Sequence, residues 1–277
     1  MEPAPVKANP YQDLYIYYLS GRFRPGRAFN PEHYIGSWEE GEFSFLFFTR
    51  PNMALVEATV NRLAGLELLD HYHMTYEQWQ GGDIVPRRIG RFVISPPWFE
   101  VGKKNADTTI VLDPGVVFGT GTHPTTLDCL EALQLVFEDT PIRSALDLGT
   151  GTGLLALAAA RMGCSKVLAV DLTLLAARTA QKNVRLNGLS TRILVAQGDA
   201  EKFMDFTSDL VVTNVHYDVM KNLIGTSGFL KKKRFILSGL MRSEAARIES
   251  AMADLPVEII RRWNQDGIWH TFYGASY

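Results

Sequence analysis

The chain has 277 residues, of which 46% are hydrophobic and 21% are charged, a composition typical of globular proteins that bury a full core. Its 28 basic and 30 acidic residues give a formal charge of -2, so the overall charge does not favour a nucleic-acid or membrane-surface binder. Cys129 and Cys164 are too few for a disulfide framework or a cysteine-based metal site. No apolar run approaches the roughly 20 residues of a membrane-spanning helix, and we expect a cytoplasmic protein.

The first eighty residues predict a small α+β domain. Aromatic and β-branched runs indicate four strands, and apolar residues at helical spacing indicate one helix before the last strand. No convincing helix is expected between the first two strands. Because this unit is too small to be a catalytic core, we expect residues 1–80 to recognise the substrate. The predicted elements are strands at 13–19, 34–38, 42–48 and 68–76 and a helix at 53–66.

A connecting segment is expected at 81–107, with one short strand at 91–95, and a second domain at 108–277. In this second domain strands and helices alternate, which predicts a parallel sheet with helices on both faces. Its last two strands flank a turn at 264–267 and predict an antiparallel hairpin. A Rossmann-like seven-stranded sheet that ends in such a hairpin is typical of class I methyltransferases. The seven strands of this sheet are expected at 144–148, 166–170, 192–196, 209–213, 234–238, 257–263 and 268–273, and a further strand is expected before them at 108–112.

A glycine-rich turn lies between the strand at 144–148 and the helix that follows it, in the sequence ALDLGTGTGL at 145–154. Glycines there allow a nucleotide to approach the backbone closely at a strand's carboxyl end. Asp147 precedes them, and its carboxylate suits a cationic amino-acid moiety but would repel a pyrophosphate. We therefore expect S-adenosylmethionine (SAM) rather than a dinucleotide, with a simple strand-end or capping role as the alternative for Asp147. The three glycines are Gly149, Gly151 and Gly153.

Three further polar residues follow the next strands. Asp171 closes the second strand, where a carboxylate can bind both ribose hydroxyls, and Asp199 follows the third strand, near the expected adenine edge. Asn214 ends the fourth strand, where this fold presents the methyl acceptor, although it could also be a turn residue. The two prolines that follow this position in many amide and adenine methyltransferases are absent here, which weakens a planar amide or a base as the acceptor.

Two other groups of residues, one basic and one of histidines, are not expected to form a functional site. The basic run at 231–234 precedes a strand and is expected to be a solvated loop. His71 and His73 alternate on one expected strand, but no further ligand lies nearby in the sequence, so we predict no metal site.

The stretch LDPGVVFGTGTHPTT at 112–126 resembles the signature loop of the PrmA family. These bacterial SAM-dependent methyltransferases modify protein eleven of the large ribosomal subunit. The resemblance covers roughly residue 78 to the C-terminus. Further matching segments are Trp79, ISPPW at 94–98, DLGTGTGL at 147–154, Asp171, NVRLNG at 183–188, VVTN at 211–214 and LSGL at 237–240.

The resemblance implies that SAM contacts Thr126, Gly149, Asp171 and Asn214. It also implies that the segment from Phe118 to His123 folds over the methionine moiety as part of the active-site wall. Asn214 would hold the acceptor amine, and Thr122 or His123 would line the methyl channel. The segment over the methionine moiety consists of Phe118, Gly119, Thr120, Gly121, Thr122 and His123.

The resemblance further implies a protein N-methyltransferase that modifies a lysine ε-amine or an N-terminal α-amine, with a large-subunit ribosomal protein docked by the N-terminal domain. Two departures concern the substrate. The N-terminal region is shorter than the family's usual recognition domain, and Val-His-Tyr follows Asn214 where Ile-Leu-Ala or Leu-Tyr-Ala is commoner. The alternatives are a methyltransferase of the same fold that acts on another protein or a small molecule, an NAD(P)-dependent oxidoreductase, and a catalytically silent SAM-fold binding module.

Overall fold

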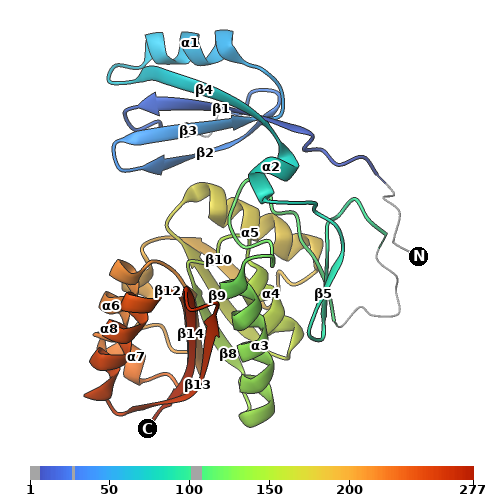
Figure 1. The fold of residues 1–277 in the computed structure, drawn as a ribbon. Coiled ribbons are helices and arrows are strands. Elements are labelled where there is room, and N and C mark those ends of the chain that lie inside the picture. The colour runs from blue at the N-terminus through green and yellow to red at the C-terminus, as the bar shows by residue number, and fades with distance from the viewer. Residues whose placement is uncertain (1–6, 27–28, 101–107) are drawn as a thin grey trace. The chain divides into compact units, whose positions relative to one another are not determined.

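The computed structural model describes residues 7–26, 29–100 and 108–277. The chain divides into two compact units, shown with their elements in Figure 1. Unit 1 comprises Met1–Val85 and Trp98–Glu100, and unit 2 comprises Pro86–Pro97 and Val101–Tyr277. Residues 101–107 of the expected connecting segment lie outside the described residues. Within the described ranges, every helix is too short or too polar to cross a membrane.

Unit 1 is a four-stranded antiparallel sheet in the order β2-β3-β1-β4, with α1 packed on one face. The predicted helix ends at Arg62, four residues early, because Leu63 has an extended backbone and Gly65 turns the chain with φ +84°. The short helix α2 was missed; Thr75 and Gln78 cap it reciprocally. The elements are β1 (Asp13–Ser20), β2 (Tyr34–Glu40), β3 (Phe43–Phe48), α1 (Met53–Arg62), β4 (Glu67–Thr75) and α2 (Tyr76–Gln80).

Between β1 and β2 the described residues contain no helix, as predicted. The side chains of Phe23 and Phe29 from this connection join the core beneath α1, where they pack around Phe48 and Val56. Two aromatic side chains thus bury apolar surface on the α1 side of the sheet without a second helix.

Unit 2 is built on a seven-stranded sheet in the order β10-β9-β8-β11-β12-β14-β13. The first five of these strands are parallel, and β14 and β13 form the antiparallel hairpin, so the predicted fold class is confirmed. The strands of this sheet are β8 (Ser144–Leu148), β9 (Lys166–Asp171), β10 (Ile193–Gln197), β11 (Leu210–Asn214), β12 (Arg234–Met241), β13 (Val257–Gln265) and β14 (Trp269–Ser276).

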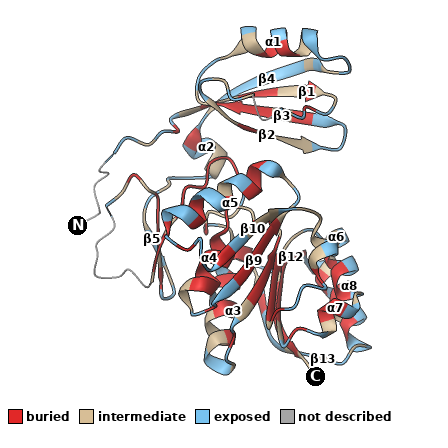
Figure 2. Ribbon diagram, turned by 180° about the vertical axis from the view of Figure 1, so that it is seen from behind, coloured by how far each residue is buried: buried red, intermediate tan, exposed pale blue. Residues whose placement is uncertain are grey.

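Helices cover both faces of this sheet, and Figure 2 shows the buried strands between them. Residues of α3 and α4 form one core layer with the sheet, whereas residues of α6 and α8 form the other. The near-continuous apolar runs of β8 and β11 follow from burial on both faces. The helices are α3 (Pro124–Asp139), α4 (Leu154–Arg161), α5 (Leu174–Leu186), α6 (Tyr217–Ile224), α7 (Ser227–Leu230) and α8 (Arg242–Ala253).

A second, three-stranded sheet in unit 2 consists of β5 (Arg87–Ile89), β6 (Phe92–Ser95) and β7 (Thr109–Val111). Strand β6 pairs in parallel with β7, and β5, which the sequence did not predict, pairs with β6. The side chain of Asn187 bonds both backbone groups of Val111, which fixes β7 to the C-terminal end of α5.

The basic run at 231–234 is only in part the solvated loop that we expected, because Lys231 and Lys233 are exposed but Lys232 is buried. Lys232 is 2% exposed, its Nζ donates to the carbonyl oxygen of Phe206, and burial lowers its pKa. Lys233 pairs with Asp209 at 2.6 Å, and Arg234 donates to the hydroxyl of Thr140. Three of the four cations therefore anchor the start of β12 within the unit.

Candidate active site

The turn between β8 and α4 needs its glycines because other parts of the chain press against it. Gly149 and Gly151 have φ of +74° and +54°. A Cβ at Gly149 would lie 2.3 Å from Cγ1 of Val215, and one at Gly151 would lie 2.6 Å from the carbonyl oxygen of Phe118. These distances are too short for any side chain, so glycine lets the end of β11 and the loop before α3 meet at this turn.

The carboxyl group of Asp147 lies buried beneath the turn, 2% exposed. Its Oδ2 accepts from the hydroxyl of Thr150 at 2.6 Å and from the backbone N–H of Ala156 at 3.0 Å, so it caps α4. Its Oδ1 is buried and has no hydrogen-bond partner among the described residues. Burial raises the pKa of Asp147 to about 7. The expected contact with a cationic moiety is therefore left to Oδ1, while Oδ2 has the capping role.

The structure brings Asp171 to the glycine turn from the end of β9. Its Oδ2 accepts from the backbone N–H of Gly151 at 3.0 Å, and its Oδ1 accepts from the backbone N–H of Thr173 at the same distance. Leu172 beside it is 69% exposed and offers an apolar surface at this strand end. Asp199 follows β10 and caps the short 3-10 helix at 200–203 by accepting from the N–H of Glu201.

The loop between β7 and α3 is fixed against the glycine turn by a residue of α5. The buried amide of Asn183 accepts from the N–H of Asp113 at 2.8 Å and donates to the carbonyl oxygens of Asp113 and Thr152. Thr152 in turn donates through its backbone N–H to Phe118 and through its hydroxyl to Gly119. Asn183 and Thr152 were not predicted as site residues, although both lie within the matched motifs.

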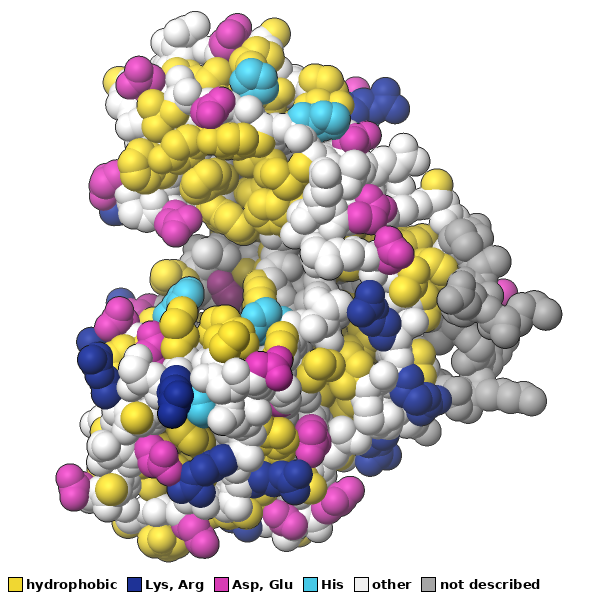
Figure 3. Space-filling model, in the orientation of Figure 1, with side chains coloured by type: hydrophobic (Ala, Val, Ile, Leu, Met, Phe, Trp, Pro, Cys, Tyr) yellow, Lys and Arg dark blue, Asp and Glu magenta, His cyan; other side chains and the backbone are white. Residues whose placement is uncertain are grey.

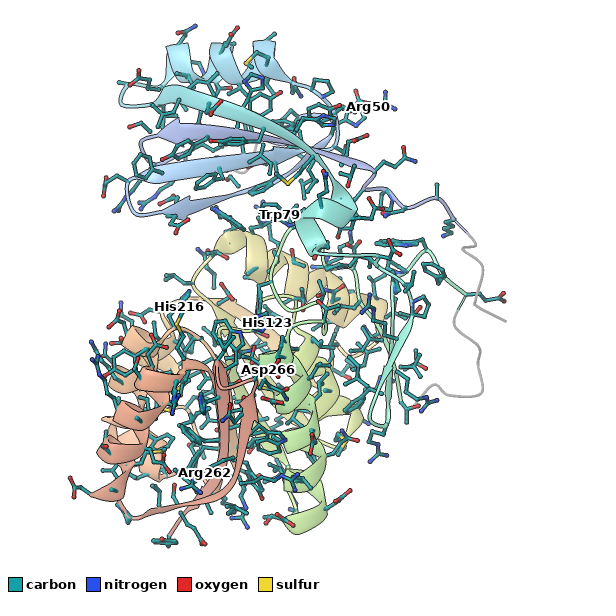
Figure 4. The ribbon with its side chains drawn as sticks, in the orientation of Figure 1. Arg50, Trp79, His123, His216, Arg262 and Asp266 are labelled. Carbon is teal, nitrogen blue, oxygen red and sulfur yellow. The ribbon has the colours of Figure 1, made fainter. Side chains whose placement is uncertain are left out.

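The end of this loop carries an aromatic cluster. His123 contacts Phe118 edge-to-face at 5.3 Å and Trp269 of β14 at 5.0 Å between ring centroids. Burial lowers the pKa of His123, which favours the neutral ring. Phe118 is 56% exposed, so the cluster has an open side. His123, His216 and the hairpin residue Asp266 lie at the same end of unit 2 in Figure 4.

His123 and Asn214 are joined through a residue that the sequence did not single out. The hydroxyl of Thr125 lies 2.8 Å from Nδ1 of His123 and accepts from Nδ2 of Asn214 at 3.1 Å. Thr122 is exposed, and its hydroxyl lies 2.8 Å from that of Thr120. Two of the three expected catalytic residues, His123 and Asn214, therefore both contact the hydroxyl group of Thr125.

Three buried polar atoms near the carboxyl ends of β8 and β11 have no hydrogen-bond partner within the described part of the chain. They are Oδ1 of Asp147, Oγ1 of Thr126 and Oγ1 of Thr213. Since buried polar atoms are normally satisfied, these groups indicate that a polar ligand or ordered water belongs at this end of the sheet.

The strand order of unit 2, its C-terminal hairpin and its acid-and-glycine turn define a class I methyltransferase fold. The family model of ribosomal protein L11 methyltransferase (PrmA) matches residues 60–276. The chain therefore belongs to this family. The match leaves out most of the unit 1 sheet.

Individual relatives show the same likeness. The chain is 40% identical over 185 residues to ribosomal protein L11 methyltransferase of Desulfitobacterium hafniense, which covers 66% of this chain and 58% of the relative. It is 36% identical over 171 residues to the enzyme so named from Exiguobacterium sp., covering 61% and 54%. A crystal structure of ribosomal protein L11 methylase from Lactobacillus delbrueckii subsp. bulgaricus is 26% identical with a TM-score of 0.59, covering 70% of this chain and 100% of that one. The chain thus spans little more than half the length of these curated relatives.

Proposed function

We propose that this chain is an enzyme that transfers methyl groups from SAM to an amine of a protein, and that the protein is ribosomal protein L11. The observation that carries the proposal is the buried Oδ1 of Asp147, which has no hydrogen-bond partner among the described residues and lies by the glycine turn that Asp171 also contacts, in a member of this family. A ribosomal protein substrate would place the reaction in the cytoplasm.

The residues at this end of the sheet fit SAM. Oδ1 of Asp147, which has no partner in the described ranges of the chain, suits a cationic amino-acid moiety, and Asp171 suits the ribose hydroxyls. Leu172 supplies apolar surface for the adenine ring, and Asp199 follows the adjacent strand, where the adenine amine would lie. The full set that we propose around SAM is Phe118, Gly119, Thr120, Thr126, Asp147, Gly149, Gly151, Gly153, Asp171, Asp199 and Asn214.

The main contribution of the residues at this site to the reaction would be to position the acceptor amine. SAM supplies an electrophilic methyl carbon on a cationic sulfur. A lysine ε-amine or an N-terminal α-amine must first lose a proton to water, and the nearby positive charge lowers the pKa of that amine. Oδ1 of Asn214 then holds a remaining N–H and aims the lone pair. The nitrogen–carbon bond forms as the carbon–sulfur bond breaks, and the bonding electron pair goes to sulfur. Thr122 and His123 line the path of the acceptor. Holding the reactants in line is worth several kcal/mol.

We further propose that unit 1 docks the protein substrate through the sheet face opposite α1. This aromatic face is defined by Tyr18, Trp38, Phe43, Phe45, Phe47 and Trp79, whose rings contact one another. Figure 3 shows hydrophobic side chains gathered over this unit. Unit 1 carries twelve Asp and Glu residues but six Lys and Arg, a balance that suits a basic partner. Ribosomal proteins bind RNA phosphates through Lys and Arg, so such a protein has the complementary charge.

Calorimetric titration with SAM and with NAD tests the proposed cofactor. We expect SAM to bind and NAD not to bind. Asp171→Ala should weaken SAM binding by roughly 10- to 100-fold, since it removes a charged acceptor from the ribose site. The control is Asp218→Ala, which removes an exposed carboxylate that pairs with Lys221 on α6 and should leave the affinity unchanged. Equal SAM affinity in the wild-type chain and Asp171→Ala would remove Asp171 from the ribose site, and binding of NAD alone would refute the methyltransferase proposal.

A further inference from the structure

The buried side chain of Thr125 lies where three hydrogen bonds meet, and their directions can be assigned. The backbone N–H of Thr125 can only donate, and its acceptor is Nδ1 of His123 at 3.4 Å. Nδ1 is therefore an unprotonated ring nitrogen, and the ring proton of the neutral imidazole is on Nε2. The hydroxyl of Thr125, 2.8 Å from the same nitrogen, must then donate its own proton to Nδ1.

The direction of the hydrogen bond between Thr125 and Asn214 follows from this assignment. Because the hydroxyl proton of Thr125 is used, Oγ1 has only lone pairs left for Asn214, and Nδ2 of Asn214 donates to it at 3.1 Å. The amide of Asn214 is thereby held with Nδ2 towards α3, and Oδ1 is the acceptor atom of this side chain. A Cβ at Gly239 would lie 2.7 Å from this Oδ1, so glycine allows the amide oxygen to lie close to the backbone of β12 in this orientation.

The position of Thr125 is itself fixed from two sides. Thr125 is 1% exposed and lies in the first turn of α3. Its carbonyl oxygen accepts from the hydroxyl of Ser238 at 3.3 Å, and Ser238 pairs with Asn214 in the ladder of β11 and β12. The hydroxyl of Thr125 and the amide of Asn214 are therefore mounted on adjoining, rigid elements.

We propose that Thr125 is the positioning residue that sets the orientation of the Asn214 amide, through a directed relay in which Asn214 donates to Thr125 and Thr125 donates to neutral His123. The relay presents Oδ1 of Asn214, rather than its NH₂ group, to the methyl acceptor. Without the hydroxyl, the amide can turn and offer two donors to an amine whose lone pair must stay free. This inference rests on the proposed function for its catalytic consequence, but not for the relay itself.

Nitrogen-15 NMR of the imidazole rings tests the relay without any substrate. In the wild-type chain we expect Nδ1 of His123 to have the chemical shift of a bare ring nitrogen and Nε2 that of an N–H nitrogen. Thr125→Ser keeps the hydroxyl and should preserve this pattern. Thr125→Val leaves only the backbone N–H as a donor to Nδ1, so the tautomer should stay the same while the Nδ1 resonance moves downfield, towards that of a ring nitrogen that accepts fewer hydrogen bonds. A proton on Nδ1 in the wild-type chain, or an unchanged Nδ1 chemical shift in Thr125→Val, would overturn the proposal.

Methyl transfer from labelled SAM to purified ribosomal protein L11 tests the consequence. Thr125→Val should lower kcat about tenfold or more while KM for SAM changes less than about twofold, since a tenfold rate change corresponds to a small loss of positioning. Thr125→Ser should restore kcat to within about threefold of the wild-type value. As a control, Thr226→Val removes a hydroxyl that caps α7 and should reduce stability but not kcat. Equal losses in the Ser and Val variants would refute the positioning role. If the wild-type chain transfers no methyl group, the proposed function fails, and the NMR measurement still decides the relay.

Discussion

At the scale of single residues, the carboxyl group of Asp147 has two oxygens in different surroundings. One caps α4 and accepts from Thr150, and the other is buried without a partner among the described residues. That this acid lies next to the glycine turn could be predicted from the sequence, because only one residue separates Asp147 from the first glycine. The sequence left capping and ligand binding as alternatives, since those depend on how the turn folds back over β8.

The pKa of Asp147 predicts a pH-dependent stability. Because burial raises this pKa to about 7, the folded chain favours the protonated carboxyl, which stabilises it below the ordinary pKa of Asp. That stabilisation is lost as the pH rises through about 7. Asp147→Asn mimics the protonated form. Between about pH 5 and about pH 8, the wild-type free energy of unfolding should fall by about 3 kcal/mol more than that of the variant. Denaturant unfolding without SAM measures this, and parallel profiles would refute the assignment.

At the scale of elements, α5 holds the loop before α3 against the glycine turn. Asn183 supplies three of the hydrogen bonds, and Asn187 bonds Val111 of β7, so the two asparagines of the matched NVRLNG segment hold the loop and the strand before it. The loop approaches the glycine turn at Gly151, where a side chain would clash with the carbonyl oxygen of Phe118. The proposed SAM site therefore depends on contacts between elements that are distant in the sequence.

Asn183→Ala should loosen this loop. It removes the three hydrogen bonds that Asn183 makes with the N–H and the carbonyl oxygen of Asp113 and with the carbonyl oxygen of Thr152, at a cost of about 3 kcal/mol in the free energy of unfolding. We expect weaker SAM binding as well, because Phe118 and Gly119 depend on Thr152 for their position. The matched control is Asn222→Ala, whose exposed amide bonds Glu201 and should be nearly neutral. If Asn183→Ala had the stability and SAM affinity of this control, the account of the loop would be wrong.

The alternating strands and helices of unit 2 could be predicted because burial on both faces leaves a clear apolar pattern, and the hairpin because its turn is marked by Asn264 and Gly267. Strand β5 could not, since three residues give no periodicity. The burial of Lys232 and the bonds of Thr125 were also missed. Both are tertiary contacts, with Phe206 and with Asn214, that no local pattern records.

At the scale of the whole molecule, the chain combines a unit that matches the family throughout with a smaller one that matches only in part. Unit 1 keeps an aromatic face on which Trp79 of α2 packs against Trp38 and Phe47, and it has an excess of acidic residues. We attribute the proposed chemistry to unit 2 and the choice of protein substrate to unit 1.

Phe43→Ser tests this division of labour. Phe43 is 39% exposed on the aromatic face, so its loss should remove a docking contact and raise KM for the protein substrate about tenfold, with SAM affinity unchanged. The control is Leu63→Ser, which removes a side chain of 40% exposure at the end of α1. Added salt should also raise this KM, because a basic partner is attracted through charges that salt screens. Equal effects of the two substitutions would count against docking on this face.

The central claim is that Asn214 aims a protein amine at the methyl group of SAM. Its most direct test is transfer of labelled methyl from SAM to purified ribosomal protein L11, followed by mapping of the modified amine, in the wild-type chain and in Asn214→Ala. We predict methylated lysine or N-terminal amine with the wild-type chain, and in Asn214→Ala a kcat lower by about 100-fold with SAM affinity within a few-fold of the wild-type value. No label on L11 with the wild-type chain, or equal losses of kcat and SAM affinity in the variant, would contradict the claim.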